Sequence, residues 1–321
     1  MLIHRAYKTE LDLTAAQRRA CVQHAGAARW AYNWGLAIRI AAYEQGEPTP
    51  YAMELHRRLN QLKRTAVPWM YDVSKCAPQE ALRNLDAAYV NFFRRVELKK
   101  LGLFDGDVGF PKPKTKKHGL GSFRLTGTIR IGERHIQLPR LGKLRLKERG
   151  YLPIDGTPEV KVLSATVSEK TGRWFVAVQV EQTLPDPKPN DRPMAGVDLG
   201  ADGAGDGECR QYSAAGTVIA NPRPLKTAMR QVKRLQRRVS RRQKGGEANR
   251  KKARERLAQA HARVANIRRE TLHQATTRLT KTKSVRQSTA VLVVEDLNLR
   301  GMQKNHRLAA AIAHDRTRSR M

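Results

Sequence analysis

Two short aliphatic runs, each carrying an acid near its end, place the strongest constraint on the fold of this chain. The first spans Met194–Gly200 and carries Asp198, and the second spans Ala290–Glu295. Runs of four to six aliphatic residues are typical of buried central strands. An ionised carboxylate is costly to bury unpaired, so each acid needs a donor, a counter-charge or a metal ion. Two strands that each present an acid at one end favour a hard divalent cation such as Mg²⁺. From these runs alone, two solvated strand ends are an equal alternative.

The charge of the chain indicates the class of its partner. The chain has 62 lysines and arginines and 29 acidic residues, which gives a net charge of +33. Positive charges at this density repel one another, and binding of a polyanion relieves the repulsion. Nucleic acid is therefore the predicted partner, with a membrane surface as the rival. No stretch approaches about 18 apolar residues, and the N-terminus lacks the apolar segment of a signal peptide. We therefore expect a cytoplasmic protein with no membrane partner.

The three cysteines do not form a recognisable site. Cys21, Cys76 and Cys209 are far apart and odd in number, so they fit neither a disulfide framework nor a CxxC zinc site. Buried or unused thiols in a reducing compartment are the predicted state.

The N-terminal third is predicted to be one strand followed by helices. Residues 2–11 fit a strand, and Thr14 and Gln17 have the spacing of a capping box that opens a helix running to about Gly46. Two more helices are predicted over 53–66 and from about 74 to 101, the second with a strong apolar stripe. Four residues of the first helix repeat at helical spacing, and we expect them to form a core face rather than a base-stacking face: Ala28, Trp30, Ala31 and Trp34.

The middle of the chain changes to β character. A basic, proline-broken loop over 110–118 cannot be helical. Short runs of period-two alternation then follow between Gly and Pro turns, which predicts antiparallel strands in a small barrel. Their outward Arg and Lys positions suit phosphates, although ordinary solvated charge is the alternative. The proline-rich segment 184–193 predicts a linker between domains at 1–183 and 194–321, with helices at about 14–101 inserted in the first.

A basic helical hairpin is predicted between Pro224 and Ser284, broken at Gly245-Gly246. Residues 225–284 hold 20 lysines and arginines against three glutamates, with only a thin apolar seam at Leu235, Val239, Leu257, Val264, Ile267 and Leu272. Such stripes are usually solvated, but this charge density favours phosphate contact. The predicted nucleic-acid-binding residues, from the loop, one strand and the hairpin, are Lys112, Lys114, Lys116, Lys117, Arg124, Arg234, Arg237, Arg238, Arg241, Arg242, Arg250, Lys251 and Lys252.

Nine stretches, in order over about 300 residues, resemble the OrfB/TnpB family of transposon-encoded, RNA-guided nucleases, which are related to type V CRISPR effectors. Each stretch is weak by itself, and the order makes the signal specific. They are residues 27–34, 79–94, 109–114, 122–126, 138–142, 196–200, 221–224, 249–254 and 294–302.

The resemblance implies an α+β multidomain fold. It consists of a helical recognition segment within a β-barrel wedge, then a RuvC-like domain of the RNase H fold that carries the basic hairpin. It also implies DNA cleavage specified by a guide RNA from the transposon end, so guide RNA and target DNA are the expected partners. Two Mg²⁺ ions clamp the scissile phosphate in such sites. By motif match Asp198 and Glu295 are the catalytic, Mg²⁺-binding residues, and Asp296 is a weaker candidate because strand alternation turns it away.

Departures from the family pattern lower the expected activity. The family continues past the second acidic strand with a long helix, a CxxC…CxxC zinc ribbon and a third catalytic aspartate, and the sequence lacks all of these, including the zinc ligands. The Gly- and Asp-rich stretch 201–210 replaces the expected second RuvC strand. We therefore expect a truncated copy that binds nucleic acid but cuts poorly. The alternatives are a fully active endonuclease or transposase accessory protein, and a non-enzymatic basic RNA-binding protein.

Overall fold

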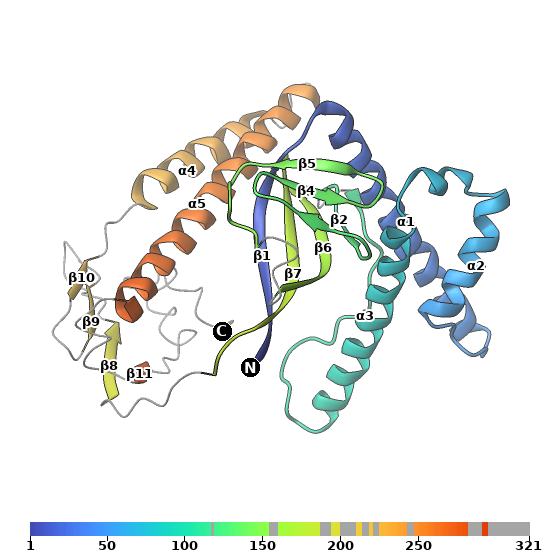
Figure 1. Ribbon diagram of the computed structural model, residues 1–321, viewed down its shortest axis with the longest axis horizontal. Helices are drawn as coiled ribbons and strands as arrows, with labels where there is room; N and C mark the ends of the chain where they lie inside the picture. The colour runs from blue at the N-terminus through green and yellow to red at the C-terminus, as the bar shows by residue number, and fades with distance from the viewer. Residues whose placement is uncertain are drawn as a thin grey trace. The chain divides into compact units, whose positions relative to one another are not determined.

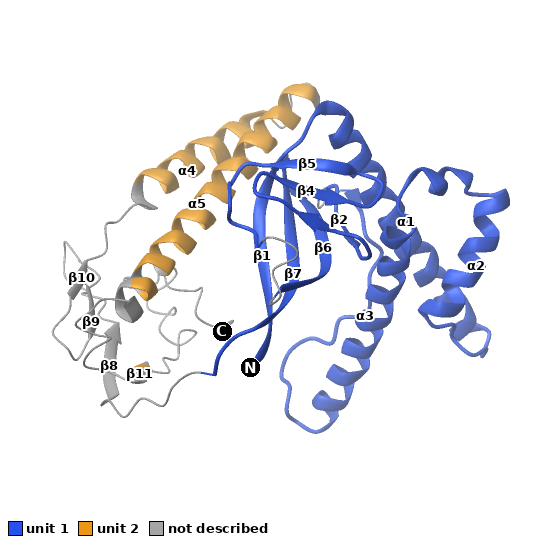
Figure 2. Cartoon of the chain, in the orientation of Figure 1, with its two compact units in different colours: residues 1–186 blue, residues 187–321 orange. Residues whose placement is uncertain are grey.

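The computed structural model divides the chain into two compact units, Met1–Asp186 and Pro187–Met321, coloured separately in Figure 2. Each unit is described by itself. The structure describes residues 1–116, 119–153, 160–186, 194–199, 210–213, 218–220, 225–242, 247–281 and 291–294.

Unit 1 begins with one strand and then folds into helices. Thr14 accepts a hydrogen bond from the Gln17 backbone N–H while the Gln17 side chain accepts one from the Thr14 N–H, so the predicted capping box is present. Pro68 lies in the first turn of the short 3₁₀ helix η1, where its missing N–H costs little. The helices span Ala15–Glu44 (α1), Ala52–Thr65 (α2), Pro68–Asp72 (η1) and Cys76–Lys100 (α3).

The apolar stripe of α3 is buried only in its first half. Leu82 and Leu85 are fully buried, whereas Phe93 is 58% exposed. Ring contacts with Tyr89 and Phe92 hold Phe93 at this surface.

Seven antiparallel strands form the sheet of unit 1, in the order β2-β6-β7-β1-β5-β4-β3 (Figure 1). The N-terminal strand is central: β1 pairs with β7 from Leu2 opposite Thr183 to Leu11 opposite Trp174. The strand predicted over residues 2–11 and the antiparallel strands predicted for the middle of the chain are present. The strands span Leu2–Asp12 (β1), Ser122–Leu125 (β2), Arg130–Ile131 (β3), His135–Leu138 (β4), Gly142–Leu146 (β5), Val160–Lys170 (β6) and Arg173–Thr183 (β7).

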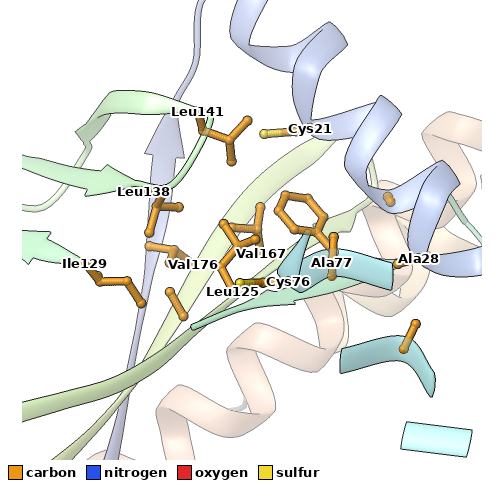
Figure 3. Close-up of a cluster of buried hydrophobic side chains, with 14 of the residues drawn as sticks. Cys21, Ala28, Cys76, Ala77, Leu125, Ile129, Leu138, Leu141, Val167 and Val176 are labelled. Carbon is orange, nitrogen blue, oxygen red and sulfur yellow. The ribbon is translucent and has the colours of Figure 1, made fainter. Parts of the chain in front are cut away.

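One hydrophobic core joins the helices of unit 1 to its sheet. Figure 3 shows Cys21 of α1 and Ala77 of α3 beside Leu125, Val167 and Val176 of the strands. Burial raises the pKa of the Cys21 thiol to about 12, so this cysteine is the inert core residue that the sequence predicts. Cys76 is also buried and free, and Cys209 lies outside the described residues.

A buried histidine ties α1 to the start of α3. The His24 Nδ1–H donates to the Ala20 carbonyl at 2.8 Å, and its Nε2 accepts from the Ser74 N–H at 3.0 Å. Both bonds require the neutral ring, because a protonated Nε2 would face the Ser74 N–H with a second donor. Burial lowers the pKa of His24 below its ordinary value of 6.5, against a smaller opposite effect of the Ala20 carbonyl.

We expect the pKa of His24 to lie below 6.5 in the folded protein and unit 1 to lose stability as the pH falls below about 6.5. The folded state then binds fewer protons than the unfolded state, so stability rises with pH through this window. Each unit of pKa difference corresponds to about 1.4 kcal/mol. NMR titration of the His24 ring measures the pKa, and urea unfolding between pH 5.5 and 7.5 measures the stability. His56→Gln is the control, because burial and nearby cations also lower the pKa of His56. A His24 ring that titrates at 6.5 or above would contradict the assignment.

The described residues of unit 2 form a four-stranded sheet in the order β10-β9-β8-β11. Strands β8 and β9 are antiparallel, as are β9 and β10, whereas β11 runs parallel to β8. Of the two predicted central strands, β8 is central and β11 lies at the edge of the described sheet, with Val293 50% exposed. The strands span Met194–Leu199 (β8), Arg210–Ser213 (β9), Val218–Ala220 (β10) and Val291–Val294 (β11).

The prediction that 201–210 replaces the second strand of this sheet is wrong. A strand begins at Arg210 and pairs with β8 from Val197 opposite Ser213 to Leu199 opposite Gln211. It was missed because its polar sequence has no strand alternation, so its pairing with β8 is set by tertiary context. Residues 201–209 lie outside the described residues.

The predicted hairpin is present as two helices, Leu225–Arg241 (α4) and Glu247–Lys281 (α5), which pack together (Figure 1). Ala228, Val232, Ala260 and Val264 form its buried seam, with Met229, Leu235, Leu257 and Ile267 partly buried beside it. The seam therefore follows the predicted face and adds small residues that the prediction omitted. Among the described helices, none is long and apolar enough to cross a membrane.

Candidate nucleic-acid interface

One face of α4 carries an unbroken set of cations. They line an open cavity of about 780 Å³, and all are exposed except Arg242, which is half-buried. Within the described part of the chain, no ion pair joins any of them to an acid. Seven like charges on one helix face repel one another, so an anion that lies along the helix would be held strongly. We call them the α4 basic face: Arg230, Lys233, Arg234, Arg237, Arg238 and Arg241 of α4, together with Arg242, which directly follows the helix.

Five of these seven residues were predicted from the sequence. Arg230 and Lys233 were missed, although their spacing of four residues from Arg234 and Arg237 places them on the same side of a helix. The predicted residues of α5 differ in exposure: Lys251 and Lys252 are exposed, whereas Arg250 is half-buried.

Two further predicted cations, Lys114 and Arg124, line one cavity of unit 1. This cavity of about 410 Å³ is walled by α3 and by strands β1, β2, β6 and β7, and Arg5 of β1 also lines it. Arg124 donates to Gln179 at 3.1 Å and lies 3.8 Å from Glu80. Arg5 was missed because its position beside Arg124 depends on strand pairing, which the sequence does not display.

Lys114 is held in place rather than freely solvated. Its backbone exchanges two hydrogen bonds with the Asn33 side chain, at 2.9 and 2.8 Å. Its ammonium lies 4.1 Å from the ring centroid of Tyr32, and burial lowers the pKa of Lys114 below its ordinary value. Lys114 is nevertheless exposed at the surface, as are Lys112 and Lys116 on the same loop, and Lys117 lies outside the described residues. The loop is therefore anchored to α1, with its other cations directed to solvent.

The two acidic strands of unit 2 run side by side. Strands β8 and β11 pair in parallel from Met194 beside Val291 to Val197 beside Val294. Asp198 is the next residue of β8 and pairs on its other side with Tyr212 of β9. Glu295 directly follows β11 and, with Asp296, lies outside the described residues.

The donor chemistry at these strand ends suits a hard cation. Carboxylate oxygens are the ligands that Mg²⁺ prefers, with water and phosphate completing the shell. Among the described residues, no group of three His, Cys, Asp or Glu side chains could hold a metal ion. The Asp198 side chain and Glu295 lie outside the described residues.

Comparison with protein families gives two matches. Residues 1–48 match the OrfB_IS605 model described as "Helix-turn-helix domain", and residues 175–306 match the model described as "Probable transposase". In the structure, the first match consists of β1 and the single long helix α1.

Curated proteins match nearly the whole chain. A Streptomyces pristinaespiralis protein named "Putative RNA-guided DNA endonuclease" is 30% identical over 97% of this chain and 71% of its own length. The Escherichia coli (strain K12) protein "Putative RNA-guided DNA endonuclease InsQ" is 28% identical over 94% of this chain and 68% of its own. A solved structure, "Cryo-EM structure of the Cas12f1-sgRNA-target DNA complex", covers 97% of this chain and 78% of its own at 10% identity. Its TM-score of 0.29 is too low to bear on the fold.

Proposed function

The chain belongs to the OrfB/TnpB family, and we propose that it is a transposon-associated protein that binds a guide RNA and the DNA to which this RNA pairs. The observation that carries the proposal is the α4 basic face, where seven cations have no acidic partner among the described residues. Phosphates are the ligands that such a face recognises, and they are common to RNA, DNA and their hybrid. Relatives named as RNA-guided DNA endonucleases support the same partners.

Unit 1 supports a second contact with the backbone of the nucleic acid. Arg5, Lys114 and Arg124 share one cavity on the sheet, and backbone contacts position a nucleic acid without reading its sequence. We assign this unit the roles of helical recognition segment and β-barrel wedge, with residues 1–183 as the domain and 184–193 as the linker.

We propose that unit 2 is the RuvC-like domain and that Asp198 and Glu295 hold Mg²⁺. The parallel register supports this, because a continuation by one residue beyond Val197 and Val294 would place Asp198 beside Glu295. When bound there, Mg²⁺ would supply charge neutralisation at a scissile phosphate and activation of water. The two carboxylates would hold and orient the ion, and the α4 basic face would bind the strand to be cut.

The number of metal-binding acids bears on the rate of cleavage. With two acids identified by motif, we propose that the 321-residue polypeptide binds well and cuts weakly, since two-metal chemistry needs both ions held firmly. A missing second strand does not contribute to this low rate, because β9 pairs with β8. The competing function is a fully active endonuclease.

Binding and cleavage of one target distinguish these possibilities. The 321-residue polypeptide is incubated with RNA transcribed from its own transposon end and with a matching DNA duplex. The dissociation constant of the complex is then measured at salt concentrations from about 0.05 to about 0.5 M, because binding through phosphates depends steeply on salt in this range. We expect log K to fall linearly with log salt, with little Mg²⁺-dependent cleavage. An affinity that does not change with salt would refute binding through phosphates, and rapid guide-dependent cleavage would establish the active endonuclease.

A further inference from the structure

Three of the four tryptophans of the chain line one open cleft of unit 1. The cleft lies between α1 and η1 and has a volume of about 730 Å³, within the range of about 300–1,000 Å³ typical of ligand pockets. Trp30 and Trp34 come from α1 and Trp69 from η1. The fourth, Trp174, is 4% exposed in the sheet, so the cleft gathers the indoles that are not fully buried.

The indoles form a flat-walled corner. The rings of Trp30 and Trp34 are nearly parallel, at 11° with centroids 5.8 Å apart. The ring of Trp69 lies edge-on to that of Trp30, with an angle of 89° between the ring planes and 6.1 Å between the centroids. Trp69 is 43% exposed, so its side of the cleft is open to solvent. A planar ligand would therefore meet an aromatic face without rearrangement of the pocket.

Two polar side chains at the rim are available to a ligand. Gln23 and Asp72 line the cleft and are exposed, and within the described residues neither side chain has a hydrogen-bond partner. The other two polar residues of the lining are engaged elsewhere: Arg29 donates to the Leu120 carbonyl at 3.0 Å, and Asn33 binds the Lys114 backbone.

We propose that this tryptophan cleft binds one unpaired nucleobase of an RNA or DNA strand by stacking. A base offers the planar face that the indoles fit, and the N–H groups on its edge can donate to Asp72 while Gln23 both donates and accepts. The Asp72 carboxylate repels phosphate, so the base lies inside and its backbone outside. The inference rests on the proposed function only in requiring a nucleic-acid partner, and it adds a contact with a base to the phosphate contacts of the α4 basic face.

Two substitutions test the cleft in different ways. Trp69→Ala removes a wall, and stacking of one base corresponds to about a tenfold loss of single-strand affinity or more. Gly26→Leu fills the space instead: an added Cβ at this lining position meets nothing within 4 Å, and replacing a helical glycine favours the helix. We expect both variants to weaken binding of single-stranded RNA or DNA oligonucleotides, and the bound strand to quench the tryptophan fluorescence of the unmodified protein.

The matched control is Tyr43→Ala, which removes an 80% exposed aromatic from the same helix and should leave affinity unchanged. The slope of log K against log salt should also stay unchanged in Trp69→Ala, because stacking releases no counterions. Comparing RNA with DNA oligonucleotides identifies which strand supplies the base. Unchanged affinity of both Trp69→Ala and Gly26→Leu, in a protein that still binds nucleic acid, would overturn the cleft proposal alone. Absence of any nucleic-acid binding by the unmodified protein would overturn the proposed function.

Discussion

Replacing Arg237, Arg238, Arg241 and Arg242 together by alanine should weaken nucleic-acid binding by about a thousandfold at 0.1 M salt. Each phosphate contact contributes about 0.9 to the slope of log K against log salt on duplex DNA, so the slope should decrease by about 3 to 4. The loss should be similar for all sequences, because these side chains would contact phosphates and not bases. Fluorescence anisotropy with labelled duplexes over a range of salt concentrations measures both quantities.

The fold should survive this change. Arg237, Arg238 and Arg241 lie on the face of α4 that lines the basic cavity, away from the seam at Ala228 and Val232, and alanine favours helix at least as well as arginine. Arg242 directly follows α4, and its replacement removes one exposed hydrogen bond, to the Asn249 carbonyl at 3.4 Å. Circular dichroism and thermal unfolding check this point.

A matched control removes the same charge elsewhere. Arg18, Arg19, Arg57 and Lys99 are exposed on the helices of unit 1, and their replacement by alanine tests the effect of net charge alone. We expect a much smaller change of slope in this control. Equal losses in the two variants would mean that overall charge, and not the α4 basic face, governs binding.

Local signals in the sequence predicted the elements that depend on neighbouring residues. Thr14 and Gln17 are three residues apart, and their reciprocal hydrogen bonds start α1 as expected. The seam of the hairpin followed from helical spacing, with Leu235, Leu257, Val264 and Ile267 packed as predicted. Helical spacing also predicts the α4 basic face, because residues on one side of a helix recur every three to four positions.

Features that depend on distant parts of the chain could not be predicted in this way. Arg5 and Arg124 line one cavity only because β2 pairs with β6 and because β6 and β1 both pair with β7. Strands β1 and β7 are about 170 residues apart in the sequence. The tryptophan cleft also needs η1 to bring Trp69 to α1. The sequence predicted a core face for Trp30 and Trp34. Both do pack against the core, and both also line the open cleft.

Asp198→Ala should abolish Mg²⁺-dependent cleavage of guide-matched DNA, lowering even a weak rate by about a hundredfold or more. The backbone of Asp198 lies in the central strand β8, between Tyr212 of β9 and the strand β11 that leads to Glu295. Its carboxylate is therefore proposed to be a ligand positioned by the pairing of Asp198 with β9 and by the pairing of β8 with β11 up to Val197. Loss of one ligand weakens the binding of the metal ion and displaces the scissile phosphate. A displacement of about 1 Å can lower the rate about a hundredfold. Cleavage is measured with the guide RNA bound and Mg²⁺ varied.

Because the expected rate is low, Mn²⁺ binding gives a readout that does not depend on cleavage. Electron paramagnetic resonance of Mn²⁺ titrated into the protein should detect a bound ion in the unmodified chain and much weaker binding in Asp198→Ala and in Glu295→Ala. Asp296→Ala is the matched control, since it removes the same charge next to Glu295 in the sequence, and strand alternation predicts that the Asp296 side chain turns away. The isosteric Asp198→Asn should behave like Asp198→Ala, because the ion requires the charge as well as the shape. Equal Mn²⁺ affinity in the unmodified, Asp198 and Asp296 proteins would show that the two strand ends do not form a metal site.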